Sequence, residues 1–379
     1  MALEIRMYDG NLTSPTLLDD LTDRASKLQF STALNGGFKV CRFNVSMRRE
    51  EAWLWLSREG KKGRHFSRVT VHDGLTLVWE GRVMEVQLNI QMGEESVTVV
   101  CYGYWNACRD QFYSMADHTD WTAGSGHFIH EIIAEMLTEE CPDINSDQSN
   151  IAEGTVDFVG LNYTTNEYPQ TRINELTAVS DADHGVWFFA IWDDRKPYLF
   201  KRTVAKIDWH VWLDSFQNLS LDQSAVELRN AILPFSGTTE RSTVTDAASL
   251  LLYPRREEKW NLPTGIGATP AEDAGTMHVT EQAYPRQKQA FSINGSVYRT
   301  TADSGGKLEE VPKWFIRAGE VIRIQDLVPA SAALALDDVR TFYIMETVYD
   351  YDTDSLQIQP DRRSRKLSTI LPGLMTLEQ

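Results

Sequence analysis

Two neighbouring stretches decide the fold: residues 75–90, LTLVWEGRVMEVQLNI, and residues 95–105, ESVTVVCYGYW. In both, apolar and polar residues alternate, which is the pattern of half-buried β-strands. The pair Asp73-Gly74 suits a hairpin turn before the first stretch, and Gly93-Glu94 suits a second turn between the two. These residues predict a β-meander that ends near Asp110.

The residues before this meander extend the β pattern. Residues 28–47, LQFSTALNGGFKVCRFNVSM, alternate around a Gly36-Gly37 break and predict further strands. Residues 50–57, EEAWLWLS, predict a short helix, and Gly60 stands where a glycine commonly follows a helix. A basic loop follows, with Lys61, Lys62 and Arg64.

The composition is that of a globular chain with room for more than one domain. Of 379 residues, 42% are hydrophobic and 24% are charged, which argues against a disordered or collagen-like chain. No apolar run approaches the ~20 residues of a membrane helix, and no secretory signal is visible, so we expect synthesis in a cytoplasm and no membrane insertion. Four sparse cysteines are expected as buried thiols: Cys41, Cys101, Cys108 and Cys141.

The negative charge is concentrated in one part of the chain. The net charge is −17, and residues 111–200 hold 16 acidic against 3 basic side chains. Nucleic-acid binding depends on displacing counterions with Lys and Arg, so a DNA-binding regulator or DNA enzyme is disfavoured. The excess is either ordinary surface solvation or a surface that repels DNA, and it marks a domain boundary.

The pattern divides the chain into three predicted domains: a first β-domain over 1–110, an acidic α+β domain over 111–215 and a second β-domain over 216–379. The middle part contains helical periodicity over 127–140 and 171–180, and a hairpin that turns at Asp193-Asp194-Arg195. Residues 254–275 are rich in Pro, Gly and Ala and are expected to form a long loop within the second β-domain.

A weak internal similarity links the two predicted β-domains. Residues 82–88, RVMEVQL, precede a turn and the strand VTV, and residues 343–349, YIMETVY, precede a turn and the strand LQI. Repeats of this kind suggest a duplicated unit. Since β-hairpin patterns are common, the similarity also fits two unrelated hairpins.

No motif supports catalysis. His127-x-x-His130-Glu131 matches neither the order H-E-x-x-H nor H-x-x-E-H, and no phosphate-binding loop or nucleophile elbow is present. The Asp350, Asp352 and Asp354 set lacks the glycine and closing glutamate of a calcium loop, so it is interpreted as an acidic turn. The sequence therefore predicts neither an enzyme nor a cofactor or metal site, although a metallopeptidase based on His127 and His130 is a weak third option.

The order of several segments along the chain is informative beyond their separate patterns. Near the N-terminus these segments are LTDRASKLQFSTALNGGFKVCRFNV (21–45), LVWEGRVMEVQLNI (77–90) and VVCYGYWNACRD (99–110); later ones are LRNAILPFSG (228–237), WFIRAGEVIRIQDLVP (314–329) and TFYIMETVYDYDTDSLQIQPD (341–361). Together they resemble the tail-hub (baseplate hub) proteins of tailed bacteriophages. That family shows an analogous glycine-glycine-aromatic entry, a (Y/W)-x-G-R-(V/I) strand and a GYW or GYY ending.

The resemblance implies a fold and a structural role in the virion. The implied fold class is mainly β with an α+β insert: two antiparallel tube-like domains, each a β-barrel or sandwich, and a small acidic α+β domain. The implied protein is a homotrimeric ring at the distal end of the tail tube, where three chains present six similar units to the six-fold tube. Its implied partners are the tail tube or distal tail protein ring, tip or central fibre proteins, the tape-measure protein and, only in transit, the genome DNA.

Candidate contact residues follow from the basic loop and the aromatic residues. Lys61, Lys62 and Arg64 are the candidate contact with an acidic neighbouring ring. Trp53, Trp55 and Trp105 are candidate interface aromatics, since interfaces favour Trp at their centres. The resemblance places the protein at the virion tail tip after synthesis in the host cytoplasm. The alternative function is a β-rich adhesin or carbohydrate-binding tail protein that uses exposed tryptophans.

Overall fold

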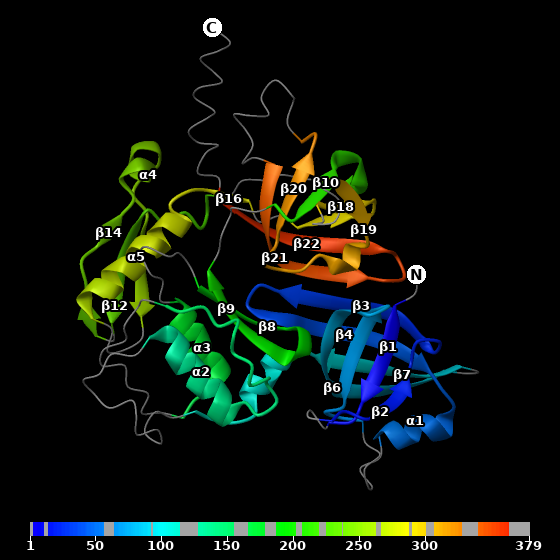
Figure 1. Cartoon of the computed structure of the whole chain (residues 1–379). Helices are drawn as coiled ribbons and strands as arrows, with labels where there is room; N and C mark the ends of the chain where they lie inside the picture. The colour runs from blue at the N-terminus through cyan, green and yellow to red at the C-terminus, as the bar shows by residue number, and fades with distance from the viewer. Residues whose placement is uncertain are drawn as a thin grey trace.

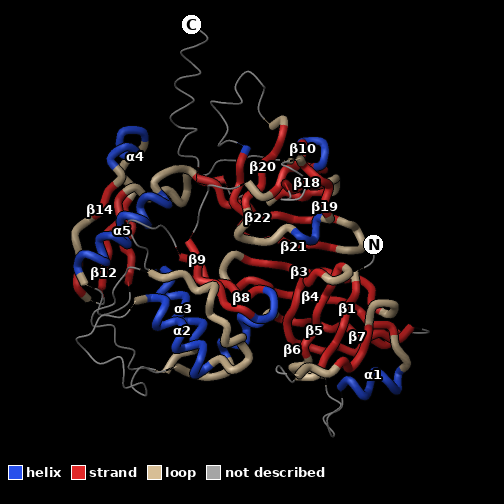
Figure 2. The backbone as a smooth tube through the Cα atoms, viewed as in Figure 1, coloured by secondary structure: helices blue, strands red, loops and turns tan. Residues whose placement is uncertain are grey.

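The computed structural model describes residues 3–10, 14–56, 64–91, 94–113, 128–154, 166–178, 187–201, 207–219, 225–236, 238–262, 267–287, 290–300, 307–327 and 340–363. Strands dominate, and they gather into lobes; most of the helices lie at one side of the molecule, and the short helix over 49–56 lies at the other (Figures 1 and 2). The chain is therefore mainly β with an α+β insert, as the sequence predicts. No helix in these ranges is long and apolar enough to cross a membrane.

The N-terminal β-unit is an antiparallel sheet with the strand order β2-β1-β5-β6-β7-β4-β3. The predicted meander is confirmed, with the turn at Gly74 between β5 and β6, and so is the short helix α1 (Arg49–Leu56). The strands are β1 (Glu4–Tyr8), β2 (Leu17–Asp20), β3 (Ala25–Ala33), β4 (Gly36–Ser46), β5 (Arg68–Asp73), β6 (Thr76–Gln91) and β7 (Glu94–Tyr102).

The C-terminal β-unit has the strand order β19-β18-β10-β20-β21-β22-β17-β11, and β16 (Arg286–Gln287) pairs with the end of β22. One pairing, β10 with β20, is parallel, so this unit is mixed where the sequence predicted an antiparallel sheet. The strands are β10 (Trp209–Trp212), β11 (Phe216–Asn218), β17 (Phe291–Ile293), β18 (Val297–Thr300), β19 (Leu308–Val311), β20 (Val321–Gln325), β21 (Thr341–Asp350) and β22 (Ser355–Arg363); η4 (Leu213–Ser215) and η6 (Lys313–Phe315) are single turns.

The two β-units repeat one arrangement. In chain order and in space, β1-β5-β6-β7-β4-β3 corresponds to β10-β20-β21-β22-β17-β11. The β6–β7 register shifts at Met84, and the β21–β22 register shifts at Met345, the residue that the internal similarity aligns with Met84. A β-bulge is a specific feature rather than a generic one, so its recurrence at matching methionines supports duplication.

A second backbone feature recurs beside each bulge. Phe66 has a positive φ of 63°, donates its N–H to the carbonyl of Val83 (2.8 Å), and lies just before β5. Gly319 has a φ of 94°, donates its N–H to the carbonyl of Ile344 (2.8 Å), and lies just before β20. Thus a residue with a left-handed backbone conformation occupies the equivalent position in both units.

A bridging segment lies between the two units in sequence. It contains η1 (Tyr104–Arg109), α2 (Ile129–Glu140), α3 (Pro169–Ala178), β8 (Trp187–Trp192), the η3 turn (Asp193–Arg195) and β9 (Lys196–Lys201). Both predicted helices and the predicted hairpin are confirmed. The hairpin joins the N-terminal unit through β8, which pairs in parallel with β4 at Gly36 and Gly37.

The expected long loop over 254–275 is wrong. Those residues form β15 (Glu257–Leu262) and much of the helix α5 (Ala268–Gln282), in a side unit with β12 (Ala231–Ser236), β13 (Thr239–Glu240), β14 (Val244–Thr245) and α4 (Ala247–Leu252). Ala271 and Ala274 are fully buried, and Gly275 faces Pro234 and Val244. Small residues that resemble a loop in sequence here allow a helix to approach a sheet closely.

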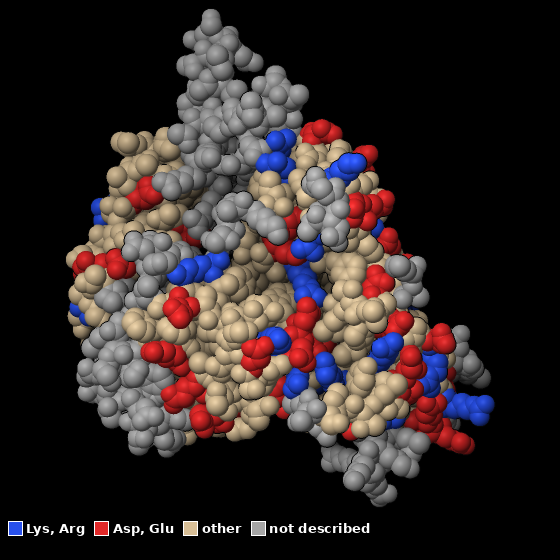
Figure 3. Space-filling model, in the orientation of Figure 1, with Lys and Arg blue, Asp and Glu red and all other residues tan. Residues whose placement is uncertain are grey.

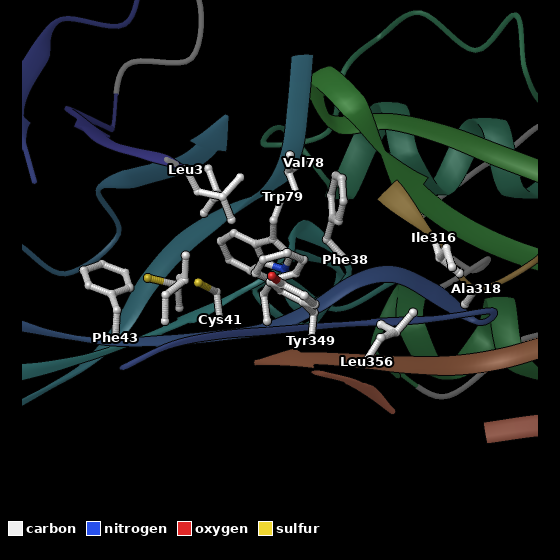
Figure 4. Packing of buried hydrophobic residues seen from close by; sticks show 14 of the residues in the cluster. Leu3, Phe38, Cys41, Phe43, Val78, Trp79, Ile316, Ala318, Tyr349 and Leu356 are labelled. Carbon is white, nitrogen blue, oxygen red and sulfur yellow. The ribbon is translucent and has the colours of Figure 1, made fainter. Parts of the chain in front are cut away.

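One hydrophobic core runs through both β-units and one face of β8 in the bridging hairpin. Figure 4 shows Trp79 and Phe38 of the N-terminal unit near Tyr349 of the C-terminal unit. A second core lies between η1, α2, α3 and β8, and it also takes in Ala271 of the side unit. The four cysteines are buried and unbonded, as predicted. Because the larger core crosses both β-units, a sequence boundary at 110 or 216 does not separate independent cores.

Candidate functional site

The site with the most specific geometry is the junction where the bridging hairpin meets both β-units. Its charged side chains come from β5, β6, η3 and the segment before β20. Figure 3 shows acidic and basic side chains mixed along the middle of one face, between the lobes. The contacts described below explain how three parts of the chain are held as one body.

Glu80 of β6 fixes the hairpin turn to the N-terminal unit. Its side chain is fully buried; it accepts the backbone N–H of Arg195 (2.6 Å) and pairs with Arg68 (2.8 Å). Burial raises the pKa of the Glu80 carboxyl, and the nearby Arg68 opposes that rise. The turn is itself strained, because Asp194 and Arg195 have φ values of 58° and 60° without being glycines.

Arg317 joins all three parts of the junction. Its guanidinium donates to Asp193 of the turn (2.9 Å) and to the carbonyl oxygen of Leu77 in β6 (2.9 Å). It also lies over the rings of Phe38 (5.1 Å) and Trp192 (5.6 Å). A planar cation held by hydrogen bonds and two aromatic faces is a rigid connection.

Arg82 forms the wall of a polar hollow beside the junction. Its side chain is 3% exposed and bonds bidentately to Asp110 (2.5 and 2.9 Å) and also to Asp143 (3.1 Å). The hollow, about 480 Å³, is lined by Gly10, Phe66, Arg82, Tyr104, Arg109, Asp110 and Asp143. Since Arg82 is bound to carboxylates from η1's end and from the residues after α2, it holds the bridging segment to β6.

The two β-units meet at a seam between β3 and β21. These strands pair antiparallel over 29–33 and 346–350. Thr32 and Thr347 share a hydrogen bond between their hydroxyls (2.6 Å), and the N–H of Ala318 donates to Thr32 (2.9 Å). Phe30 packs on Tyr349 with ring centroids 5.3 Å apart. The seam is thus both hydrogen-bonded and apolar.

The predicted contact residues differ in their exposure, and two of them are not described by the structure. Lys61 and Lys62 lie outside the described residues, and Arg64 lies over the ring of Trp55 (5.5 Å). Trp53 is 55% exposed on α1. Trp55, however, is 1% exposed and belongs to the core, which corrects its assignment as an interface aromatic.

Trp105 is another predicted interface aromatic that packs within the chain. Its ring lies 5.1 Å from that of Phe189, and its carbonyl oxygen accepts a hydrogen bond from Gln170 (3.1 Å). Among the described tryptophans, Trp53 is the exposed one. The carbohydrate-binding alternative needs exposed tryptophans, and this distribution gives it little support.

His130 and Asp354 make structural contacts. His130 accepts the N–H of Gly154 at Nδ1 (3.1 Å), and His127 lies outside the described residues. Asp354 accepts from Tyr349 (2.9 Å) and from Lys313 (2.8 Å), so the predicted acidic turn is confirmed. Within the described ranges, no three His, Cys, Asp or Glu side chains are placed to hold a metal ion.

Sequence reasoning missed the junction residues Glu80, Arg195 and Arg317. The available signal was a single charge within an apolar strand pattern, as in LVWEGRV around Glu80 and WFIRAGEV around Arg317. Charged residues are rarely buried unless paired. The contacts that link the three parts of the chain could not be identified, because their partners are more than 100 positions apart in sequence.

The arrangement matches solved structures across nearly the whole chain. A 43 kDa tail protein of prophage MuSo2 from Shewanella oneidensis aligns with 96% of this chain and 97% of its own, with a TM-score of 0.59 and 11% identity. The chain has the fold of phage tail proteins.

Two further structures share this tail-protein fold. A tail protein from Neisseria meningitidis MC58 gives a TM-score of 0.62 at 8% identity, with 96% of each chain covered. The prophage tail protein gp18 from Listeria monocytogenes EGD-e gives 0.54 at 12% identity, with 99% of this chain and 100% of gp18 covered. No protein-family model matches the sequence, and no curated protein matches it. The likeness is therefore one of fold.

Proposed function

We propose that this chain is a structural virion protein that forms the hub ring at the distal end of a bacteriophage tail tube. The tail-protein fold, shared over 96% or more of the chain, supports a place in the tail. The observation that carries the hub assignment is the duplicated β-unit, with its bulge at Met84 and again at Met345. A chain with two equivalent units can match a six-fold tube as a homotrimer.

The proposed role is mechanical rather than enzymatic. The buried charges found at the junction are paired with one another, and Arg317 and Glu80 hold the bridging segment against both β-units. This is what a load-transmitting ring requires. Its proposed partners are a second and third copy, the tail tube or distal tail protein ring, tip or central fibre proteins and the tape-measure protein.

The acidic charge suits a channel through which the genome passes. The net charge of −17 in each copy repels phosphate, whereas a cationic wall would bind DNA and slow its ejection. We expect Asp and Glu to outnumber Lys and Arg on the channel-facing surface. A map of the assembled ring tests this, and a lumen lined by net positive side chains would contradict it.

The basic loop and Trp53 are proposed to contact an acidic neighbouring ring. Reversing Lys61 and Lys62 to Glu should block tail assembly and leave the fold intact, because complementary charge sets register and association rate. Arg64 is better left in place, since it packs on the buried Trp55. A matched control reverses the exposed Arg255 and Arg256 of the side unit. Normal assembly of the loop variant would show that the loop is merely solvated.

The decisive experiment combines mass with position. Native mass spectrometry of the purified chain should show three times the 43.1 kDa monomer, and gold-labelled antibody should mark the tail tip in negatively stained virions. A chain that is absent from virions refutes the tail role. A chain that is present along the shaft, or present as a monomer, refutes the hub ring.

A further inference from the structure

The four buried cysteines lie in the fold as two pairs. Cys41 of β4 is directly opposite Cys101 of β7 in the antiparallel ladder of the N-terminal unit. Cys108 of η1 and Cys141, the residue after α2, lie in the second core, where their thiols are hydrogen-bonded to each other. A single buried cysteine acts as a small apolar residue. Two thiols in contact can also react with each other, and the surroundings of the two pairs differ.

Arg82 holds together the two segments that carry Cys108 and Cys141. Asp110 lies two residues after Cys108, and Asp143 lies two residues after Cys141. The Arg82 guanidinium donates to both carboxylates, at 2.5 Å to Asp110 and 3.1 Å to Asp143. Because the two cysteines lie near the ends of helical segments rather than in paired strands, their backbones can move by the small distance that separates a thiol contact from a bond.

The strand pair Cys41 and Cys101 lacks that freedom. Gly103 donates its N–H to the carbonyl of Lys39 (2.8 Å), and hydrogen-bonded pairs alternate along an antiparallel ladder, so Cys41 and Cys101 form a hydrogen-bonded pair. In such a pair the Cβ atoms are about 5.5 Å apart, whereas a disulfide needs about 3.5–4.5 Å. Both strands are also paired along their other edges, with β3 and with β6. These two thiols therefore provide a comparison within the same chain.

We propose that Cys108 and Cys141 are an oxidation site, at which a low-molecular-weight disulfide such as oxidised glutathione converts the two thiols to a disulfide bond. One cysteine thiolate attacks a sulfur of the small disulfide and releases one small thiol; the second cysteine attacks the resulting mixed disulfide and releases the other. The two cysteines lose two electrons, the small disulfide is reduced to two thiols, and the two cysteine protons pass to the leaving thiolates. The inference goes beyond the proposed tail function and does not rest on it.

Burial controls the rate of this reaction. Cys108 and Cys141 are 0% and 1% exposed. The hydrogen bond with Cys141, together with burial, raises the pKa of the Cys108 thiol well above its ordinary value. Since the thiolate is the reactive form and the small disulfide must reach it, oxidation needs a transient opening at the end of α2. The same burial then protects the disulfide from reduction, so the product is a lasting link between η1 and α2.

Oxidation of the unaltered full chain is the direct test. The reduced chain is incubated with excess oxidised glutathione at mildly alkaline pH, in urea below the unfolding transition so that only local opening is promoted. The remaining thiols are then alkylated after full denaturation. Peptide mapping by mass spectrometry should find Cys108 joined to Cys141, with Cys41 and Cys101 alkylated. Alkylation of every cysteine, or a disulfide between any other two, would overturn the inference.

A matched pair of variants tests the link itself. In the oxidised chain the amides of the last turn of α2, residues 137–140, should exchange at least about tenfold more slowly than in the reduced chain, because the disulfide opposes opening of that turn. Cys141→Ala should abolish this slowing, whereas Cys41→Ala, which also replaces a buried thiol, should keep it. Equal exchange in the oxidised and reduced unaltered chain, or slowing that survives Cys141→Ala, would refute the link.

Discussion

The two β-units share their backbone plan and differ in what covers them. Each has a bulge at a methionine and a residue of positive φ before the adjoining strand: Phe66 in one unit and Gly319 in the other. They differ beside that strand, where β1 is antiparallel to β5 while β10 is parallel to β20. They differ again at the seam, since β21 is covered by β3, whereas β6 has no described partner strand on that side beyond Val83. Duplication has kept the backbone features and changed the contacts.

Two glutamates show how the units diverged. In the N-terminal unit Glu80 receives the bridging turn, and in the C-terminal unit Glu320 receives the indole N–H of Trp209 in β10 (2.7 Å) and the N–H of Arg317 (2.8 Å). The two glutamates occupy different positions in the repeated plan. Glu80 therefore anchors the bridging turn, whereas Glu320 joins β10 to the residues before β20 within its own unit.

The largest effect is expected from Glu80→Ala. Removing this carboxylate leaves Arg68 and the N–H of Arg195 unpaired in the interior, which costs about 3–5 kcal/mol for a broken buried pair. Denaturant unfolding measures the loss. As a control, Arg68→Met combined with Glu80→Leu should lose less than Glu80→Ala alone, because no charge is stranded. A loss below that of ordinary surface variants would show that the anchor is dispensable.

Gly37→Ala should rank next, and it tests the join between β4 and β8. Gly37 has a φ of 80°, and an added Cβ would lie 2.1 Å from the carbonyl oxygen of Ile191. The left-handed conformation alone costs about 1–2 kcal/mol for a residue with a side chain, and the clash adds to it. Gly74→Ala, with a φ of 58° and nothing within 4 Å of the added Cβ, should show the conformational cost alone. Similar unfolding midpoints for the two variants would mean that β8 is not packed closely against β4 at Gly37.

Glu320 provides a test by pH. Burial raises the pKa of its carboxyl above the ordinary value of 4.5. The folded chain then holds this proton more tightly than the unfolded chain, so the contribution of Glu320 to stability falls as pH rises from 4.5 through the raised value. Glu320→Gln keeps an oxygen acceptor and should flatten this slope. Unfolding free energies of both proteins between pH 4.5 and 7 measure it, and parallel curves would contradict the expectation.

Substituting the residue of positive φ in each unit should have a smaller effect on stability. Gly319→Ala imposes a strain of about 1–2 kcal/mol at a φ of 94°. Phe66→Gly relieves a similar strain but removes the ring that lies 5.2 Å from Arg82, so its net change should be smaller. Thermal unfolding of both variants tests whether the two positions are equivalent. An unchanged unfolding temperature for Gly319→Ala would show that the backbone conformation at this position is not strained for a residue with a side chain, and the proposed equivalence with Phe66 would be wrong.

The smallest effect is expected at the rim of the seam. Lys39 and Glu346 pair at 2.9 Å, with about half of each side chain exposed. Exposed pairs contribute about 0–1 kcal/mol because water and salt screen them. Glu346→Gln should therefore change stability little, and the change should shrink further in high salt. A large loss would mean that charge, rather than Thr32, Thr347 and the packed rings, holds the two units together.

Local pattern predicted most elements, and it failed where small or polar residues had distant partners. The meander, both helices of the bridging segment and the acidic turn follow from periodicity and turn residues. Helix α5 was missed because its Ala, Gly and Pro content is typical of a loop, and only packing against β12 makes those residues helical. The sequence predicts an interface role for Trp55, and this is wrong because periodicity in a short helix does not tell which face is covered.

The sequence alone determined the β-rich class, the turns, the uneven charge and, through Met84 and Met345, a trace of duplication. These depend on neighbours along the chain, where alternation and turn chemistry act over a few residues. Only the tertiary structure decided the parallel strands, the side unit, the Glu80 and Arg317 junction and the unequal edges of β6 and β21. The contacts of the junction and of the β10–β20 and β4–β8 pairs join residues more than 100 positions apart. The side unit depends on a parallel pairing of β12 with β15 and on packing against α5, and the edge of β6 beyond Val83 has no described partner strand. Local pattern carries no information about any of these.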